Sequence, residues 1–180
     1  YSDELKTELS VFDVIGTDAI VDWIWVELRD KNDTSIVIDG QSGLLQRDGD
    51  IVGVDGVSSI SFNQVSDNYY VAIGHRNHLK IITSTVYNLS TTNTITNLFN
   101  DSSKITGGIN ALIDMGTGIY AMPSGDYDSN GQIQTIDASD VISILGSSGY
   151  NKADMDMNGQ VQTIDIDNII NKNVGKGQQF

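Results

Sequence analysis

The chain has 180 residues, enough for one ordinary hydrophobic core and a small additional module. Its apolar fraction of 39% is sufficient for folding, and 24 acidic against 10 basic residues give a formal charge of −14, which argues against nucleic acid as a partner. The absence of cysteine excludes disulfides, thiolate metal sites and cysteine nucleophiles, and no stretch approaches the roughly 20 apolar residues of a membrane span.

The chain up to residue 123 shows a β pattern throughout. Residues 20–29 alternate, yet both faces of the segment are mostly apolar, which predicts a central strand. Further strands are predicted at residues 8–14, 35–39, 43–47, 58–63, 69–75, 80–88, 94–99 and 118–122. Many short strands at this spacing predict a mainly β fold, an antiparallel β-sandwich of immunoglobulin-like or transthyretin-like type. The strand at 8–14 is a candidate for addition to the sheet edge of another molecule.

Two pairs of side chains in this β part are candidates for binding. Trp23 and Trp25 share a strand face and are expected either to stack on sugar rings, as in carbohydrate-binding modules, or to be core or interface aromatics, which is the more common place for tryptophan. His75 and His78 could both reach a metal from a loop. Without a third ligand nearby, they fit a polar strand end better.

The single proline, Pro123, lies where the sequence pattern changes and predicts a boundary between a β-sandwich domain at 1–123 and a second module at 124–180. The second module contains one twelve-residue motif twice, at 126–137 and 154–165. Glycine occupies position 6 of both copies, where a sharp turn requires a residue without a Cβ. Asx-rich turns are the alternative explanation, but they do not account for two copies that match position by position.

The motif has the oxygen ligands that calcium requires at positions 1, 3, 5, 7, 9 and 12. We expect side-chain oxygens from positions 1, 3, 5 and 12, a backbone carbonyl from position 7 and a water-mediated contact from position 9. The predicted ligands of two calcium ions are Asp126, Asp128, Asn130, Gln132, Gln134 and Asp137 in the first loop and Asp154, Asp156, Asn158, Gln160, Gln162 and Asp165 in the second.

Each loop is followed, but not preceded, by a helical pattern. Breaker residues stand before both loops, so the unit is loop then helix rather than an EF-hand, and position 12 is aspartate where the EF-hand pattern has glutamate. Residues 125–175 therefore resemble a type I dockerin, the duplicated calcium loop–helix module of secreted bacterial proteins. The resemblance implies a pseudo-two-fold relation between the copies and cohesin contacts at positions 10 and 11, which are Thr135, Ile136, Thr163 and Ile164. Isoleucine at position 11 departs from the two small hydroxyl residues usual in cellulose-degrading systems.

The whole chain also resembles the C-terminal region of large secreted surface proteins of Bacteroidota-type bacteria, on the segments 20–23, 27–30, 45–50 and 75–79 followed by the paired loops. This resemblance implies an extracellular or cell-surface location and provides no catalytic residues.

Catalysis finds no support in the sequence, because it contains no nucleophile elbow, zinc-protease motif, phosphate loop or dinucleotide fingerprint. We expect a non-catalytic calcium-binding structural or adhesion protein that assembles with other protein subunits, in a filament or surface matrix. The alternatives are a dockerin that docks its parent protein onto a cohesin scaffold, and polysaccharide binding by the sandwich.

Overall fold

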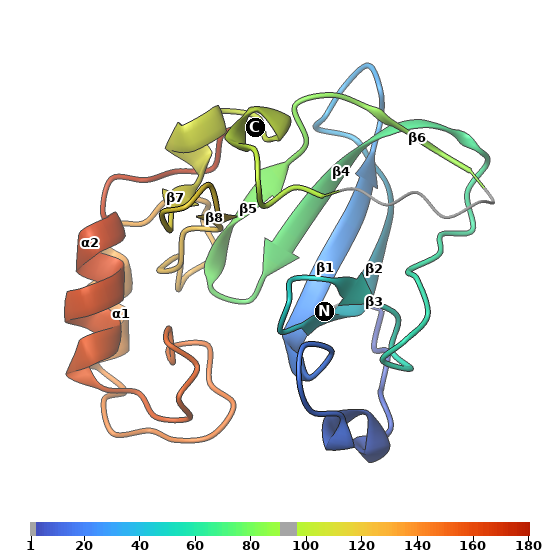
Figure 1. The fold of residues 1–180 in the computed structure, drawn as a ribbon. Helices are drawn as coiled ribbons and strands as arrows, with labels where there is room; N and C mark the ends of the chain where they lie inside the picture. The colour runs from blue at the N-terminus through green and yellow to red at the C-terminus, as the bar shows by residue number, and fades with distance from the viewer. Residues whose placement is uncertain (1–2, 91–96) are drawn as a thin grey trace.

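The computed structural model describes residues 3–90 and 97–180 and is mainly antiparallel β with few helices (Figure 1). Its strands are β1 (Ile20–Arg29), β2 (Val37–Gln46), β3 (Ile51–Val52), β4 (Asp67–His75), β5 (His78–Ile82), β6 (Tyr87–Leu89), β7 (Ile113–Asp114) and β8 (Tyr120–Ala121). The main sheet has the order β3-β2-β1-β4-β5, with β6 also paired to β4, and β7 and β8 form a separate two-stranded sheet.

Strand β1 lies between β2 and β4, as its two apolar faces predict. Trp25 is paired with Ser42 of β2 on one side and with Gly74 of β4 on the other. Ile24, Val26 and Leu28 of this strand are buried. The central position satisfies the backbone groups of β1 on both edges through the two neighbouring strands.

Several predicted strands differ from the observed ones. The segments 35–39 and 43–47 belong to one continuous strand, β2, while 80–88 is divided between β5 and β6. Residues 58–63 contribute only an isolated bridge between Val52 and Ser59, and 118–122 shortens to β8. The prediction at 94–99 falls partly outside the described residues, and its described part, 97–99, is not a strand.

The strand predicted at 8–14 is wrong, because this segment forms the 3-10 helix η1 (Leu9–Asp13). Only Val11 of η1 is buried, and it lies against Gly56, where an added Cβ would come within 3.3 Å of it. A strand would need a neighbour for its N–H and C=O groups. In the helical turn, the N–H group of Val11 instead donates to the carbonyl of Glu8 at 3.2 Å.

A helical segment begins near the end of each predicted loop. Helix α1 (Thr135–Ile142) begins at position 10 of the first loop. The π-helical turn η4 (Asp165–Ile170) begins at position 12 of the second loop and leads into α2 (Asn171–Asn173). Two short 3-10 helices, η2 (Ser102–Lys104) and η3 (Gly108–Ala111), precede β7. Among the described residues, no helix has the length and apolar character needed to cross a membrane.

The largest buried apolar cluster lies within residues 124–180, the loop–helix part, and reaches the sheet. It consists of Leu79, Ile133, Ala138, Val141, Ala153, Met155, Val161, Ile166 and Ile170. Leu79 belongs to β5, so the sheet inserts one side chain into this core. Its backbone N–H also donates to the carbonyl of Pro123 at 2.8 Å. The loop–helix part is therefore packed against the end of the β4–β5 hairpin.

Candidate metal centre

Asp137, at position 12 of the first loop, is fully buried and holds the loop closed. Its Oδ1 accepts hydrogen bonds from the backbone N–H groups of Tyr127 and Asp128 at 2.7 and 3.2 Å, and its Oδ2 accepts one from Gln134 at 2.8 Å. The equivalent distances at Asp165 in the second loop are 2.7, 3.2 and 2.7 Å. A carboxylate at this position also caps the following helix, whose amino end favours negative charge.

The turn at position 6 has the conformation that the sequence predicts. Gly131 and Gly159 have φ values of 82° and 88°, in the left-handed region where glycine pays no Cβ penalty. Their N–H groups donate to Oδ2 of the position 1 carboxylates, Asp126 at 3.1 Å and Asp154 at 2.8 Å. The two loops thus share this turn geometry.

Three carboxylates converge in each loop. One ligand oxygen from each of Asp126, Asp128 and Asp137 lies within 4.8 Å of the other two, and the same holds for Asp154, Asp156 and Asp165. Oδ1 of Asp126 is buried and has no hydrogen-bond partner in the part of the chain that the structure describes. An unpaired buried carboxylate oxygen that faces two more carboxylates is the environment a hard cation would satisfy.

The electrostatics of the triads also favour a bound cation. Burial raises the pKa of Asp126, and the neighbouring charges of Asp137 and Asp128 raise it further. The hydrogen bond from Gly131 N lowers this pKa but does not outweigh the other effects. Burial also raises the pKa of Asp156, with added repulsion from Asp165 and Asp154. Crowded carboxylates repel one another, and a divalent cation between them would reverse that repulsion.

The remaining predicted ligands lie around the rim of the loops. The Oδ1 atoms of Asn130 and Asn158, at position 5, accept the N–H groups of the position 7 residues at 2.8 and 2.9 Å, and their Nδ2 atoms donate to the position 3 carboxylates at 2.8 and 2.9 Å. The side chains at positions 7 and 9 are exposed, and they belong to Gln132, Gln134, Gln160 and Gln162. Gln134 also caps α1, which the loop pattern alone did not predict.

Each loop is paired with the segment that follows the other loop's helix. In the first loop, Ile133 donates to the carbonyl of Lys176 at 2.9 Å and accepts from Gly175 at 2.9 Å. In the second, Val161 donates to Ser147 at 2.8 Å and accepts from Gly146 at 2.9 Å. The backbone pairing is therefore reciprocal between the two loop–helix units. It also ties the segment after α2 to the first loop.

The candidate partner contacts are on the surface. Ile136 is 48% and Ile164 is 40% exposed. Their neighbours at position 10, Thr135 and Thr163, are exposed as well. The repeated loops therefore present two equivalent small patches of threonine and isoleucine.

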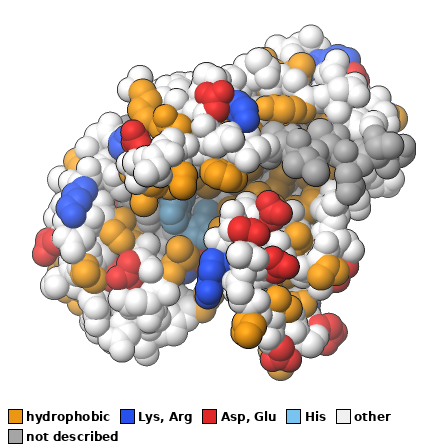
Figure 2. All heavy atoms as spheres, in the orientation of Figure 1, with side chains coloured by type: hydrophobic (Ala, Val, Ile, Leu, Met, Phe, Trp, Pro, Cys, Tyr) orange, Lys and Arg blue, Asp and Glu red, His pale blue; other side chains and the backbone are white. Residues whose placement is uncertain are grey.

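The two histidines lie at the junction between the sheet and the loop–helix part, where Figure 2 shows histidine side chains lining a recess. Their Nδ1 atoms are 2.7 Å apart, and Nε2 of His75 is 3.0 Å from Oδ2 of Asp22. Burial lowers the pKa of His78 to about 3, with help from the charges of His75 and Arg76. The acidic groups suited to a metal in the described residues are the two loop triads, and this pair belongs to neither.

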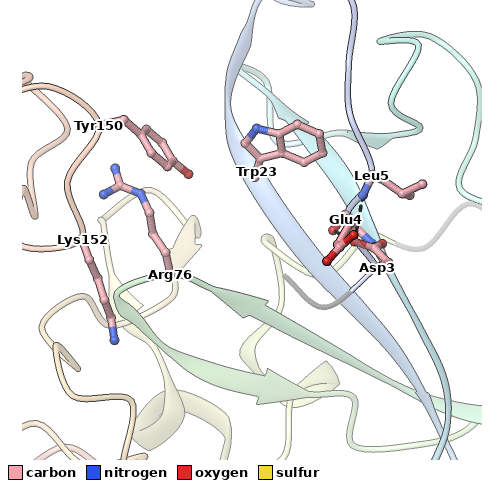
Figure 3. Close-up of a pocket in the computed structure, with 8 residues that line it drawn as sticks. Asp3, Glu4, Leu5, Trp23, Arg76, Tyr150 and Lys152 are labelled. Carbon is pink, nitrogen blue, oxygen red and sulfur yellow. Dashed lines mark hydrogen bonds between the residues drawn. The ribbon is translucent and has the colours of Figure 1, made fainter.

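The tryptophans differ in their surroundings. Trp25 is half-buried, and its Nε1 donates to Oε1 of Glu27 at 2.9 Å. Trp23 is half-exposed and lines a cleft of about 360 Å³ between β1 and the loop that carries Tyr150 (Figure 3). The cleft is also lined by Asp3, Glu4, Leu5, Ser42, Arg76 and Lys152.

The junction contains contacts that sequence reasoning missed. Asp22, Arg76 and Tyr150 form one network across it, and Asn77 is fully buried there. The available sequence signal was the presence of charged residues, Asp22, Glu27 and Arg29, in the largely apolar strand β1.

No protein-family model and no curated protein matches the chain. A search of solved structures finds a chain of the Coh3ScaB–XDoc_M1ScaA complex, an N-terminal interface mutant of a type II cohesin–X-dockerin complex from Acetivibrio cellulolyticus. The match has a TM-score of 0.50 and 14% sequence identity, and it covers 97% of this chain and 92% of that chain. A C-terminal interface mutant of the same complex gives TM-score 0.47 at 15% identity with the same coverage. The first likeness is one of fold and extends over nearly the whole chain.

Proposed function

We propose that this protein is a non-catalytic, calcium-binding extracellular protein that acts in protein–protein assembly. The observation that carries the proposal is the repetition of one loop geometry around two carboxylate triads, each with two buried members. Each triad offers carboxylate oxygens, which suit a hard cation such as calcium. The exposed Asp128 and Asp156 leave each triad accessible from solvent.

Calcium binding would also stabilise the loop–helix part. A cation that binds only the folded loops stabilises them by mass action. It would offset the mutual repulsion of the carboxylates, which contributes to the raised pKa of Asp126. In a chain without cysteine, two ions would take the place that disulfides hold in many small extracellular modules.

For the partner, we infer a dockerin-like role in which residues 124–180 bind a cohesin-like receptor. The paired loop–helix units and the exposed Ile136 and Ile164 support this role. The likeness of fold to a chain from a cohesin–X-dockerin complex agrees with a protein partner. In this proposal the N-terminal part is a β-sandwich that supports the module.

The test is binding of the chain to an immobilised type II cohesin, with an immobilised dockerin in parallel, in millimolar calcium and after chelation. Calcium-dependent binding to cohesin is expected, and the double variant Ile136→Asp and Ile164→Asp should abolish it. Ile142→Asp, on an exposed residue at the end of α1, is the matched control. Binding to the dockerin alone would instead make the chain a cohesin-like receptor and reject the inferred role.

Self-assembly into a filament or surface matrix is the second candidate. The exposed apolar side chains of the N-terminal segment favour it, since Leu9 is 83% and Ile15 is 89% exposed. Strand addition by residues 8–14 is not the mechanism, because the segment is helical. Light scattering in calcium should show polymers that disappear in the double variant Leu9→Ser and Ile15→Ser, and a monomer at every concentration would reject self-assembly.

Polysaccharide binding is supported by Trp23 in its cleft. Trp23→Ala should abolish retention on a glycan column without changing the unfolding midpoint. Unchanged retention would exclude a sugar platform at this side chain, and a lower midpoint would identify it as a packing residue.

A further inference from the structure

Asn77, in the turn between β4 and β5, is bonded to the entrance of both cation loops. Its backbone carbonyl accepts a hydrogen bond from Gly125 N at 2.8 Å, immediately before the first loop begins at Asp126. Its side-chain Nδ2 donates to the carbonyls of Lys152 at 2.9 Å and Asp154 at 3.2 Å, where the second loop begins. One fully buried residue of the sheet thus contacts both position 1 segments.

The Asn77 side chain is itself held in place. Its Oδ1 lies 3.0 Å from Nδ1 of His75 and 2.8 Å from Nδ1 of His78, so both ends of the amide have partners. An amide has two donor hydrogens, and here they meet two carbonyls. Burial makes these bonds costly to leave unmade, because water cannot replace them.

We propose that Asn77 is a positioning residue that sets the first carboxylate of each cation loop, and that it couples cation binding to the β sheet. This inference rests on the calcium binding proposed above. The first loop is positioned by the backbone of Asn77 and the second by its side chain. A substitution at Asn77 therefore acts mainly on the second loop, whereas general loss of stability would act on both.

Arg76 supports the same end of the second loop. It donates to the carbonyl of Asn151, and its guanidinium lies over the ring of Tyr150, 4.4 Å from the centroid. These contacts attach residues 150 and 151, which precede the second loop, to the β4–β5 turn of the sheet. The first loop receives no comparable side-chain support from this turn in the described residues.

The two loops can be measured separately in the full chain with terbium as the probe. Tyr127, at position 2 of the first loop, sensitises an ion bound there, while the second loop has Met155 at that position. Gln160→Trp, at the exposed position 7, adds a reporter for the second loop. Competition with calcium then gives the calcium affinity of each site.

Asn77→Ala should weaken binding at the second loop by about tenfold, as expected for the loss of a buried hydrogen-bond pair, and at the first loop by no more than about threefold. Asn63→Ala, at an exposed asparagine of the β part, is the matched control and should change neither. Equal weakening of both loops, or no change, would overturn the positioning role. Absence of ion binding in the unsubstituted chain would instead reject the calcium proposal.

A second measurement needs no substitution. Amide hydrogen exchange at Leu79, whose N–H donates to Pro123 beside the Asn77 turn, should slow at least tenfold when calcium is added. The amide of Val26, central in β1, serves as the reference. Protection confined to the loops would show that the ions are not coupled to the sheet, and this result would overturn the proposal even where Asn77→Ala fails to fold.

Discussion

The hydroxyl of Tyr150 donates a hydrogen bond to Oδ1 of Asp22 at 2.7 Å, and so joins the segment before the second loop to the first strand of the sheet. The other oxygen of Asp22 accepts from Nε of Arg76 at 3.1 Å and lies 3.0 Å from Nε2 of His75. Burial raises the pKa of Asp22, but the bonds from His75 and Tyr150 outweigh it and hold that pKa well below its usual range. A single buried carboxylate therefore organises the junction.

Removing one partner of this network should destabilise the fold. Tyr150→Phe should lower the free energy of unfolding by about 1 kcal/mol, and Asp22→Ala by about 3 kcal/mol, because the latter leaves buried donors unpaired. Urea unfolding gives both values, with Tyr87→Phe on β6 as the control. Equal small effects of all three changes would show that the junction does not contribute to stability.

Stability should fall in mild acid because of His78. Its pKa in the folded chain is about 3, so between that value and the unfolded value near 6.5 the unfolded state binds more protons. The contribution is therefore fully present above pH 6.5 and is lost as the pH falls. From pH 7 to 4.5 the loss should reach between about 2 and 3 kcal/mol.

His78→Gln should flatten this pH dependence. Comparing the two slopes cancels the contribution of the loop carboxylates, which titrate in both proteins. Asp22 contributes only at lower pH, because its depressed pKa gives stability that is lost below the ordinary range of aspartate. Identical slopes for the two proteins would contradict a neutral buried His78.

The two position 12 carboxylates should be required for cation binding. Asp137→Asn and Asp165→Asn should each weaken calcium at their own loop by at least about tenfold and lower the calcium-dependent rise in melting temperature. Calorimetric titration measures the affinities, and Asp167→Asn, an exposed carboxylate beside Asp165, is the control. A control that behaves like the two loop variants would indicate loss of general negative charge rather than of a ligand.

Shortening the chain after Val174 should affect only the first loop. The removed residues include Gly175 and Lys176, which hydrogen-bond Ile133, whereas the second loop is paired with residues 146–149. Terbium luminescence sensitised by Tyr127 should therefore weaken while the signal from Gln160→Trp is unchanged. Loss at both loops would show that the two units fold as one.

The loops were predictable because the residues that define each of them are contiguous in the sequence. Gly131 and Gly159 have the positive φ that position 6 requires, and a helical segment follows at the end of each loop, as the sequence pattern predicts. Each of these features depends on residues within one twelve-residue window, so local chemistry decides it. The central strand at 20–29 was predictable for the same reason, since its two apolar faces are visible in the pattern itself.

The contacts between residues that are far apart in the sequence were decided by the tertiary structure. The segment 8–14 has strand-like residues but no partner strand, and it became the helix η1. Asn77 has no sequence signal, because its role comes from carbonyls at 152 and 154 that only the folded chain brings to it. The sequence by itself therefore determined the two loops and the central strand, which are local patterns of side chains and backbone turns. Only the fold decided the junction, because buried polar groups find their partners through packing.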